Sequence, residues 1–215
     1  MDSRAPRRRL SVDERRAEIL RCAVEVTREC GLAGLTLSEV RARAGVSAGL
    51  SSHYFTSLDG LRVAVFEELF DSVAVPDSAP PARRLALMIG DFAATDADAI
   101  ANASAWVDAV LLGRSSDALR RAVARRMRLD RAEMTEAIRE GCDAGAFRSD
   151  DAERSAQRIL VALDGYLMQF LTQEDAAARV ALRRVVWDIA ERELGVGEGG
   201  LRGLVDGAEA DGPHS

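Results

Sequence analysis

The chain has 215 residues, of which 47% are hydrophobic and 30% charged, and its formal net charge is −6. This length suits one hydrophobic core, or one core with a small second domain. The negative net charge excludes a protein that is basic throughout. Neither an apolar run of about eighteen residues nor an apolar signal segment is present, so the sequence predicts a cytoplasmic protein without membrane contact.

Candidates for catalysis and metal binding are few. The three cysteines lack CxxC spacing, and His53 and His214 are the two histidines of the chain. This composition disfavours a zinc site, a disulfide framework and a histidine-dependent catalytic triad. The phosphate-loop, HExxH and GxSxG motifs are also missing from the sequence. We therefore expect a binding protein that is not an enzyme and needs no metal and no cofactor.

Two helices are predicted at the start of the chain. Ser11 and Glu14 have the spacing of a capping box, and apolar residues then recur at helical intervals as far as Gly31. Thr36 and Glu39 repeat this spacing at the short segment LSEVRARA, and Gly45 after it is suited to a left-handed stop. The pattern predicts a long helix, a short helix and a tight turn.

A third and a fourth helix follow the turn. Ser47 can cap a helix that runs from Ala48 to about Tyr54. This stretch lies in the segment AGVSAGLSSHYF, whose glycines and serines are unusual inside a helix and suggest that the helix has something to contact closely. The fourth helix is expected from Leu58 to about Val73.

The charge is divided unevenly along the chain. Residues 1–60 carry a net charge of +2 and residues 61–215 carry −8, which favours an anion-binding N-terminal region. Val75–Pro81 holds three of the five prolines and predicts a hinge. We expect an N-terminal domain at 1–60, a helical domain at 61–194 and a glycine-rich, disordered tail at 195–215.

Beyond the prolines, apolar residues at helical spacing predict four or five more helices, and strand alternation is absent, so the expected fold class is all-α. The stripes consist of Leu85, Met88, Ile89 and Phe92; Trp106, Val107, Val110 and Leu111; Leu119, Val123, Met127, Met134 and Ile138; Ile159, Leu160, Leu163, Tyr166, Leu167 and Phe170; and Val180, Val185, Val186, Ile189 and Leu194. The last two stripes are too apolar to leave in water. We expect them to form a four-helix interface between two copies of the chain.

The second and third predicted helices have the form of a helix-turn-helix, whose second helix enters the DNA major groove. The small residues Ala48 and Gly49 allow the backbone to approach the base edges closely. Ser52 and His53 can form hydrogen bonds with bases, and Leu50 can contact a thymine methyl group. These side chains would read the sequence of the DNA.

Other residues of the motif are placed to hold the sugar-phosphate backbone. Ser47 and Tyr54 can contact phosphates beside the groove, and Arg41 and Arg43 on the preceding helix offer two positive charges. Val46 and Phe55 are expected to face inward. The alternative interpretation is a helical adaptor whose helix-turn-helix binds protein rather than DNA.

Residues Gly31–Leu61, GLAGLTLSEVRARAGVSAGLSSHYFTSLDGL, resemble the DNA-binding domain of the TetR family of repressors, most closely its BetI-like branch. Leu160–Leu171, LVALDGYLMQFL, is similar to the same branch. The resemblance implies about nine helices, divided between a three-helix DNA-binding domain and a C-terminal domain for ligand binding and dimerisation. It also implies a homodimeric repressor that binds a palindromic operator in double-stranded DNA and is released by a small-molecule effector.

The residues expected to contact DNA are Thr36, Arg41, Arg43, Ser47, Ala48, Gly49, Leu50, Ser52, His53 and Tyr54. Two positions depart from the family's usual pattern. Ser51 stands where an apolar residue is usual, and Leu58 stands where a lysine usually holds a phosphate. Arg62, one turn later, is the candidate to supply the missing phosphate contact.

The effector pocket is expected among the C-terminal helices. Its candidate residues are Phe92, Trp106, Asp108, Met127 and Tyr166, with Asp91 and Glu133 as further carboxylates able to face a cation. The ring of Trp106 suits an aromatic compound or, beside a carboxylate, a cation. Hydrophobic cations and aromatic metabolites are therefore the first candidate effectors, and betaine or choline, implied by the resemblance, come second. For each residue, an ordinary place in the core or at the surface is the alternative.

Overall fold

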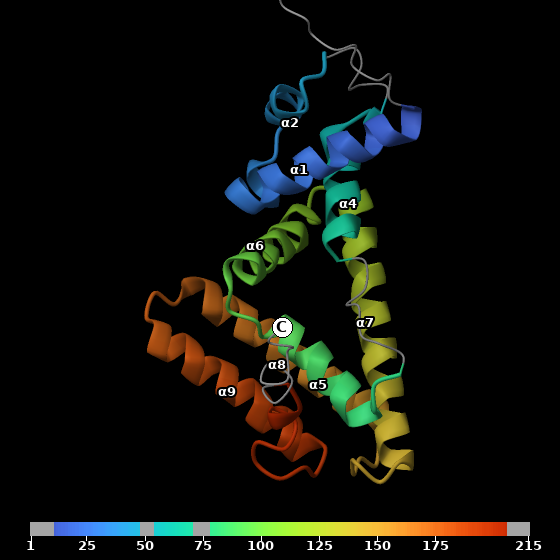
Figure 1. Ribbon diagram of the computed structural model, residues 1–215, viewed down its shortest axis with the longest axis vertical. Coiled ribbons are helices and arrows are strands. Elements are labelled where there is room, and N and C mark those ends of the chain that lie inside the picture. Colours follow the sequence, from blue (N-terminus) through green and yellow to red (C-terminus); the bar gives the residue numbers. More distant parts are fainter. Residues whose placement is uncertain (1–10, 48–53, 71–77, 206–215) are drawn as a thin grey trace, which may run out of the picture.

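The computed structural model describes residues 11–47, 54–70 and 78–205 of the chain. Over these residues the regular elements are α-helices, as the sequence predicts (Figure 1). The helices are α1 Val12–Gly34, α2 Leu37–Ala44, α4 Leu58–Leu69, α5 Pro81–Phe92, α6 Ala97–Leu112, α7 Asp117–Asp143, α8 Ala152–Thr172 and α9 Ala176–Glu193. The third helix expected over 48–54 lies outside the described residues apart from Tyr54.

Local capping signals explain where the first helices begin and end. The Ser11 hydroxyl accepts a hydrogen bond from the Glu14 amide at 3.1 Å, and the Glu14 carboxylate accepts one from the Ser11 amide at 2.7 Å. The helical path of α1 is broken at Gly31, where φ is 75°. Thr36 caps α2, which ends at Gly45 with a left-handed φ of 63°. The predicted caps at Ser11 and Thr36, the break at Gly31 and the left-handed stop at Gly45 are confirmed.

The N-terminal helices form one end of the molecule, which we call the head (α1, α2 and α4). α1 packs against α2 and α4 within the head and lies across α6 of the body, which comprises α5 to α9 (Figure 1). α4 leaves the head alongside α7 and ends at Leu69, earlier than the expected Val73. Residues 71–77 lie outside the described residues, and α5 begins at Pro81, a position in the first helical turn that suits proline.

The apolar stripes of the body are mostly buried within a single subunit. α8 packs against both α7 and α9. Most members of the two stripes expected to pair between subunits are buried inside this chain, namely Ile159, Leu163, Tyr166, Leu167, Phe170, Val186 and Leu194. The exposed large hydrophobic residues of α8 and α9 are Val161, Met168, Val180 and Val185. The predicted interface residues were therefore wrong in the main, because the stripes face the chain's own core.

The glycine-rich segment after α9 is folded on the body as far as residue 205, so the expected disordered tail begins too early. The carboxylate of Glu191 is buried and accepts hydrogen bonds from the amides of Gly199 at 2.7 Å and Leu201 at 2.9 Å. Leu201 is buried, and the Val205 side chain lies against Gly90 of α5. The remainder of the predicted tail, 206–215, lies outside the described residues.

None of the helices in the described ranges is long and apolar enough to cross a membrane.

Candidate nucleic-acid interface and effector cavity

α2 and the turn after it form the first half of the predicted helix-turn-helix. The turn closes through the Gly45 and Val46 amides, which donate to the Ala42 and Arg41 carbonyls at 3.4 and 3.1 Å. Ser47 is exposed directly after this turn. The five residues expected to meet the bases, Ala48, Gly49, Leu50, Ser52 and His53, lie outside the described residues, as does Ser51.

The chain returns to the described part of the head at Tyr54. Phe55 is buried at 6% exposure, and the guanidinium of Arg16 lies 5.3 Å from the centre of its ring. Val46 and Tyr54 are half-buried and pack against the core. The inward orientation predicted for Phe55 and Val46 is therefore confirmed.

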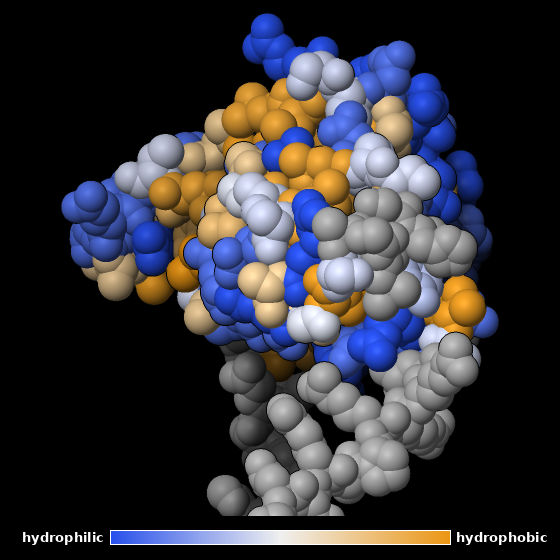
Figure 2. All heavy atoms as spheres, turned by 90° about the horizontal axis from the view of Figure 1, so that it is seen from above, coloured by the Kyte–Doolittle hydropathy of each residue, from blue (hydrophilic) through white to orange (hydrophobic). Residues whose placement is uncertain are grey.

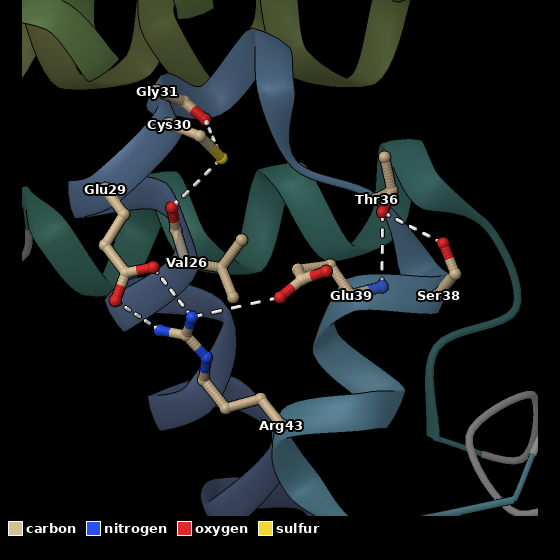
Figure 3. A network of polar contacts seen from close by, with 8 residues as sticks. All are labelled: Val26, Glu29, Cys30, Gly31, Thr36, Ser38, Glu39 and Arg43. Atoms are coloured by element: carbon tan, nitrogen blue, oxygen red, sulfur yellow. Dashed lines mark hydrogen bonds and ion pairs between the residues drawn. The ribbon is translucent and has the colours of Figure 1, made fainter.

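Arg43 joins α2 to α1. Its guanidinium forms two hydrogen bonds with the Glu29 carboxylate, at 2.6 and 2.7 Å, and lies 3.9 Å from the Glu39 carboxylate (Figure 3). The hydrogen bond from Arg43 lowers the pKa of Glu29, and the same bond raises the pKa of Arg43. Its positive charge is therefore engaged in bracing the head, which the sequence did not indicate.

Two other residues expected to contact DNA also have local partners. The Thr36 hydroxyl accepts a hydrogen bond from the Glu39 amide at 3.2 Å and lies 3.1 Å from the Ser38 hydroxyl (Figure 3). The Nε of Arg41 donates to the Leu37 carbonyl at 2.8 Å. These contacts fix the start and one face of α2.

Seen from above, the described surface of the molecule at the head end mixes hydrophilic and hydrophobic residues (Figure 2).

Arg62 does not occupy the position expected of a phosphate ligand. Its side chain is only 15% exposed, and its guanidinium donates to the carbonyls of Leu32 at 3.2 Å and Ala33 at 3.1 Å. These hydrogen bonds pair two carbonyl groups at the end of α1, so that in this structure the guanidinium does not replace the missing lysine. Leu58, at the start of α4, packs against the core.

A cavity of about 650 Å³ lies in the body between the end of α4 and helices α5 to α8. Its aromatic lining consists of Phe70, Phe92 and Trp106. The rings of Phe70 and Trp106 meet edge to face at 5.3 Å, an arrangement that fixes the orientation of both. A second cavity of about 220 Å³ shares Phe92 and Trp106 with the first and also contains Met127.

The larger cavity is acidic. Asp91, Asp96, Asp98 and Asp130 line it, together with Arg126 as the one cation among the described residues of the lining. Arg126 is bound to Asp130 at 2.7 Å and Arg28 lies 3.9 Å from Asp98, so Asp91 and Asp96 are the lining carboxylates that supply the excess charge. Burial, followed by the charge of Asp96, raises the pKa of Asp91. Burial also raises the pKa of Asp130, although Arg126 acts in the opposite direction.

The structure separates the predicted pocket residues into two groups. Phe92, Trp106 and Met127 line the cavities, whereas Asp108 and Tyr166 line neither. Tyr166 is buried, and its hydroxyl donates to the Ala93 carbonyl at 3.4 Å. Asp108 accepts a hydrogen bond from the Ala33 amide at 2.9 Å, at the junction with the head. Asp108 was misplaced because Trp106, two residues earlier, faces away from it on the same helix.

The remaining carboxylates were only partly foreseen. Asp91 lines the larger cavity, and Glu133 binds Arg126 at 2.8 Å. Asp96 and Asp98, which the sequence reasoning missed, form an acidic pair at the start of α6. Arg126 and Asp130 are four residues apart on one helix, and this spacing could have predicted their ion pair from the sequence.

Asn102 adds a polar group to the larger cavity. Its side-chain oxygen is buried and has no hydrogen-bond partner among the described residues. A buried acceptor left unpaired is costly, so a donor supplied by a bound molecule would stabilise it. The cavity thus offers an aromatic wall, excess negative charge and one vacant acceptor.

Comparison with known families divides the chain at the same place as the fold. Residues 19–65 match the model of the bacterial regulatory proteins of the tetR family, and residues 81–195 match the model of the C-terminal domain of BetI-type transcriptional repressors. The HTH-type transcriptional regulator BetI of Rhizobium meliloti (strain 1021) is 30% identical over 164 residues, which cover 73% of this chain and 78% of that protein.

Solved structures with the same fold include two regulators. A TetR transcription regulator from Haloarcula marismortui aligns with a TM-score of 0.74 and 21% identity, over 85% of this chain and 99% of the other. A transcriptional regulator from Saccharomonospora viridis, crystallised with choline, aligns with a TM-score of 0.73 and 19% identity, over 85% of this chain and 98% of the other. The two family models and the relative from Rhizobium meliloti favour DNA binding over the helical-adaptor interpretation.

Proposed function

Since this chain belongs to the TetR family of transcriptional regulators and has a BetI-type C-terminal domain, we propose that it is a repressor controlled by an organic cation. It binds a palindromic operator in double-stranded DNA as a homodimer in the cytoplasm. The cation enters the acidic, aromatic cavity of the body and favours a conformation that releases the operator. The observation that carries the proposal is the composition of this cavity.

A cation fits the cavity for two physical reasons. Asp91 and Asp96 leave an excess of negative charge that a positive ligand would neutralise, whereas Asp98 has Arg28 as a partner at 3.9 Å. The faces of Phe92 and Trp106 attract a cation through their ring electrons, and each such contact contributes about 0.5–2 kcal/mol. A neutral aromatic ligand would use the rings but leave the carboxylates uncompensated. The choline bound by the regulator from Saccharomonospora viridis is a cation of the expected kind.

Asn102 narrows the chemistry of the ligand further. Its unpaired oxygen would accept a hydrogen bond from a hydroxyl or amine of the bound molecule. A small quaternary ammonium compound with a hydroxyl group meets all three requirements of the lining. Choline is therefore the first compound to test.

DNA recognition is assigned to the predicted third helix and its flanks. Ser52 and His53 read bases, while Ser47 and Tyr54 hold the backbone. The two recognition helices of a dimer then lie about 34–36 Å apart, or a multiple of this distance, to match successive major grooves of a palindrome.

The dimer interface is assigned to the outer faces of α8 and α9. Val161, Met168, Val180 and Val185 are between 51% and 66% exposed on these helices in the single subunit. Exposed apolar residues grouped on two neighbouring helices suit a four-helix contact between copies. Light scattering of the wild-type protein and of Met168→Asp tests this assignment, since the variant should be monomeric at micromolar concentration.

The central experiment compares choline with 3,3-dimethylbutan-1-ol, its neutral isostere. Footprinting first locates the operator in the intergenic DNA beside the gene. Calorimetry and operator binding are then measured with each compound. We expect choline to bind and weaken operator binding, and the neutral compound to do neither. Equal binding of both compounds would contradict a cation site, and binding of neither would remove small hydroxylated cations as effectors.

A further inference from the structure

The turn Gly31–Gly34 at the end of α1 is held by one side chain from each of two other helices. From α6, the Asp108 carboxylate accepts the Ala33 amide hydrogen bond at 2.9 Å. From α4, Arg62 donates to the carbonyls of Leu32 at 3.2 Å and Ala33 at 3.1 Å. The amide and the carbonyl of Ala33 are thus bound by opposite charges on different helices.

Gly31 permits this close approach. Its φ of +75° is one that residues with a side chain rarely adopt, and a Cβ atom there would lie 2.6 Å from the Asp108 carboxylate oxygen. Any side chain would therefore displace Asp108 or strain the turn. The contact between α1 and α6 depends on the absence of a side chain at this residue.

The helices that hold the turn also line the effector cavity. On α6, Asn102, Ala103 and Trp106 face the cavity, and Asp108 lies two residues beyond Trp106 on the side that faces the head. Leu69, the last residue of α4, and Phe70, which follows it, line the cavity about two turns beyond Arg62. Because a helix turn moves as a unit, a shift of α6 at Trp106 is carried to Asp108 over about 3 Å of helix axis.

We propose that Asp108 is a positioning residue that couples the effector cavity to the DNA-binding head. It ties the end of α1 to α6, so that an effector that displaces α6 also displaces α1. This inference rests on the proposed function and specifies how its cavity regulates the head. An effector that favours the displaced arrangement of α6 then lowers operator affinity, because it binds the two arrangements unequally.

The alternative route runs through α4 alone, which spans both head and body. Arg62 would then hold the turn while Asp108 contributed only stability. The two routes differ in what Asp108→Ala does: a structural role alters the melting temperature, whereas a coupling role alters the factor by which the cavity changes operator affinity. That factor is the decisive measurement.

The first arm uses choline and the footprinted operator. In wild type, choline should raise the operator Kd by a factor in the usual allosteric range of about 5–150. In Asp108→Ala and Gly31→Ala this factor should fall to about two or less, while choline affinity stays close to wild type. Asp108→Asn retains an acceptor for the Ala33 amide and should preserve the effect. Ser104→Ala, on the same helix but in neither site, is the matched control.

The second arm needs no ligand. Ala103 is 6% exposed and lines the cavity, so Ala103→Trp fills it from α6. We expect this variant to bind the operator more weakly than wild type, and Asp108→Ala in the same chain to remove most of that loss. Circular dichroism and thermal melting of each variant verify that it is folded.

The outcomes separate the inference from the proposed function. If choline does not bind, the proposed effector is wrong. The comparison of Ala103→Trp with and without Asp108→Ala then still tests coupling through Asp108. If choline or Ala103→Trp weakens operator binding equally with and without Asp108, coupling does not pass through this residue and the inference is overturned. An Ala103→Trp protein with wild-type operator affinity overturns it as well.

Discussion

The head and the body each contain an arginine bound to two carboxylates, and the two clusters differ mainly in their exposure to water. The clusters are Arg43 with Glu29 and Glu39, and Arg126 with Asp130 and Glu133. The side chains of Arg43, Glu29 and Glu39 are 28%, 62% and 57% exposed, whereas Arg126 and Asp130 are each 11% exposed and Glu133 is 46% exposed. Water therefore screens the first cluster far more than the second.

The difference shows in the direction of the pKa shifts. In the head, hydrogen bonding to Arg43 lowers the pKa of Glu29. In the cavity, burial raises the pKa of Asp130 even though Arg126 is bound to it. At the surface, pairing with arginine thus favours the charged form of the carboxylate. In the buried cluster, the same pairing only offsets part of the penalty for burying the charged carboxylate. Removing one carboxylate should therefore destabilise the protein more in the body cluster than in the head cluster.

The largest expected effect comes from breaking the buried cluster. Asp130→Ala leaves Arg126 buried with Glu133 as its remaining carboxylate, and loss of one partner from a buried pair costs about 3–5 kcal/mol of unfolding free energy. Glu133 keeps part of the compensation, so the lower end of this range is expected. Urea unfolding measures the loss, and a change below about 1 kcal/mol, the value typical of surface pairs, would remove the distinction between the clusters.

The next effect separates residues that read DNA from those that brace the head. His53→Ala should cost roughly 1–3 kcal/mol at one base position and relax the preference there. Arg43→Ala should instead change the affinities of all operator variants by a similar factor, because its charge is engaged with Glu29. Binding to a set of single-base operator variants distinguishes the two patterns. An unchanged ranking in His53→Ala would refute its assignment as a base contact.

An intermediate effect concerns Asp91, a cavity carboxylate with no ion-pair partner among the described residues. Asp91→Asn should weaken choline binding by about two- to fivefold, since partly exposed ion pairs contribute less than about 1 kcal/mol. Choline binds the ionised form, and the pKa of Asp91 is raised, so affinity should rise as pH increases through that raised pKa. Calorimetry between pH 4 and 8 should show this dependence in wild type and its reduction in Asp91→Asn. Asp117→Asn, on an exposed helix start, serves as the control.

The smallest effect is expected from the head cluster. A carboxyl group whose folded pKa is lowered adds stability above its unfolded pKa and loses it as the pH falls through the folded pKa. Glu29→Gln should therefore reduce the acid sensitivity of the head slightly, and added salt should diminish the difference between the two proteins. Thermal melting from pH 3 to 7 at two salt concentrations measures both trends. A loss as large as that in Asp130→Ala would contradict the comparison.

The sequence by itself determined the all-helical fold, the helix-turn-helix and the family. Ser11, Thr36 and Gly45 mark helix ends correctly because their caps form within three or four residues of chain. The apolar stripes located the body helices for the same reason, since helical periodicity is a local property. Phe92, Trp106 and Met127 were placed at the cavities because large apolar residues on facing helices meet inside a bundle.

Only the tertiary structure decided the partners that charged residues find far along the chain. Asp108 binds a backbone amide 75 residues away, Arg62 turns inward to the end of α1, and Arg43 is held by Glu29. The stripes of α8 and α9 turned inward, and Glu191 anchored part of a tail expected to be disordered. The periodicity of side chains predicts which residues share a helix face, but the packing of whole helices determines whether that face contacts the core, another helix or solvent.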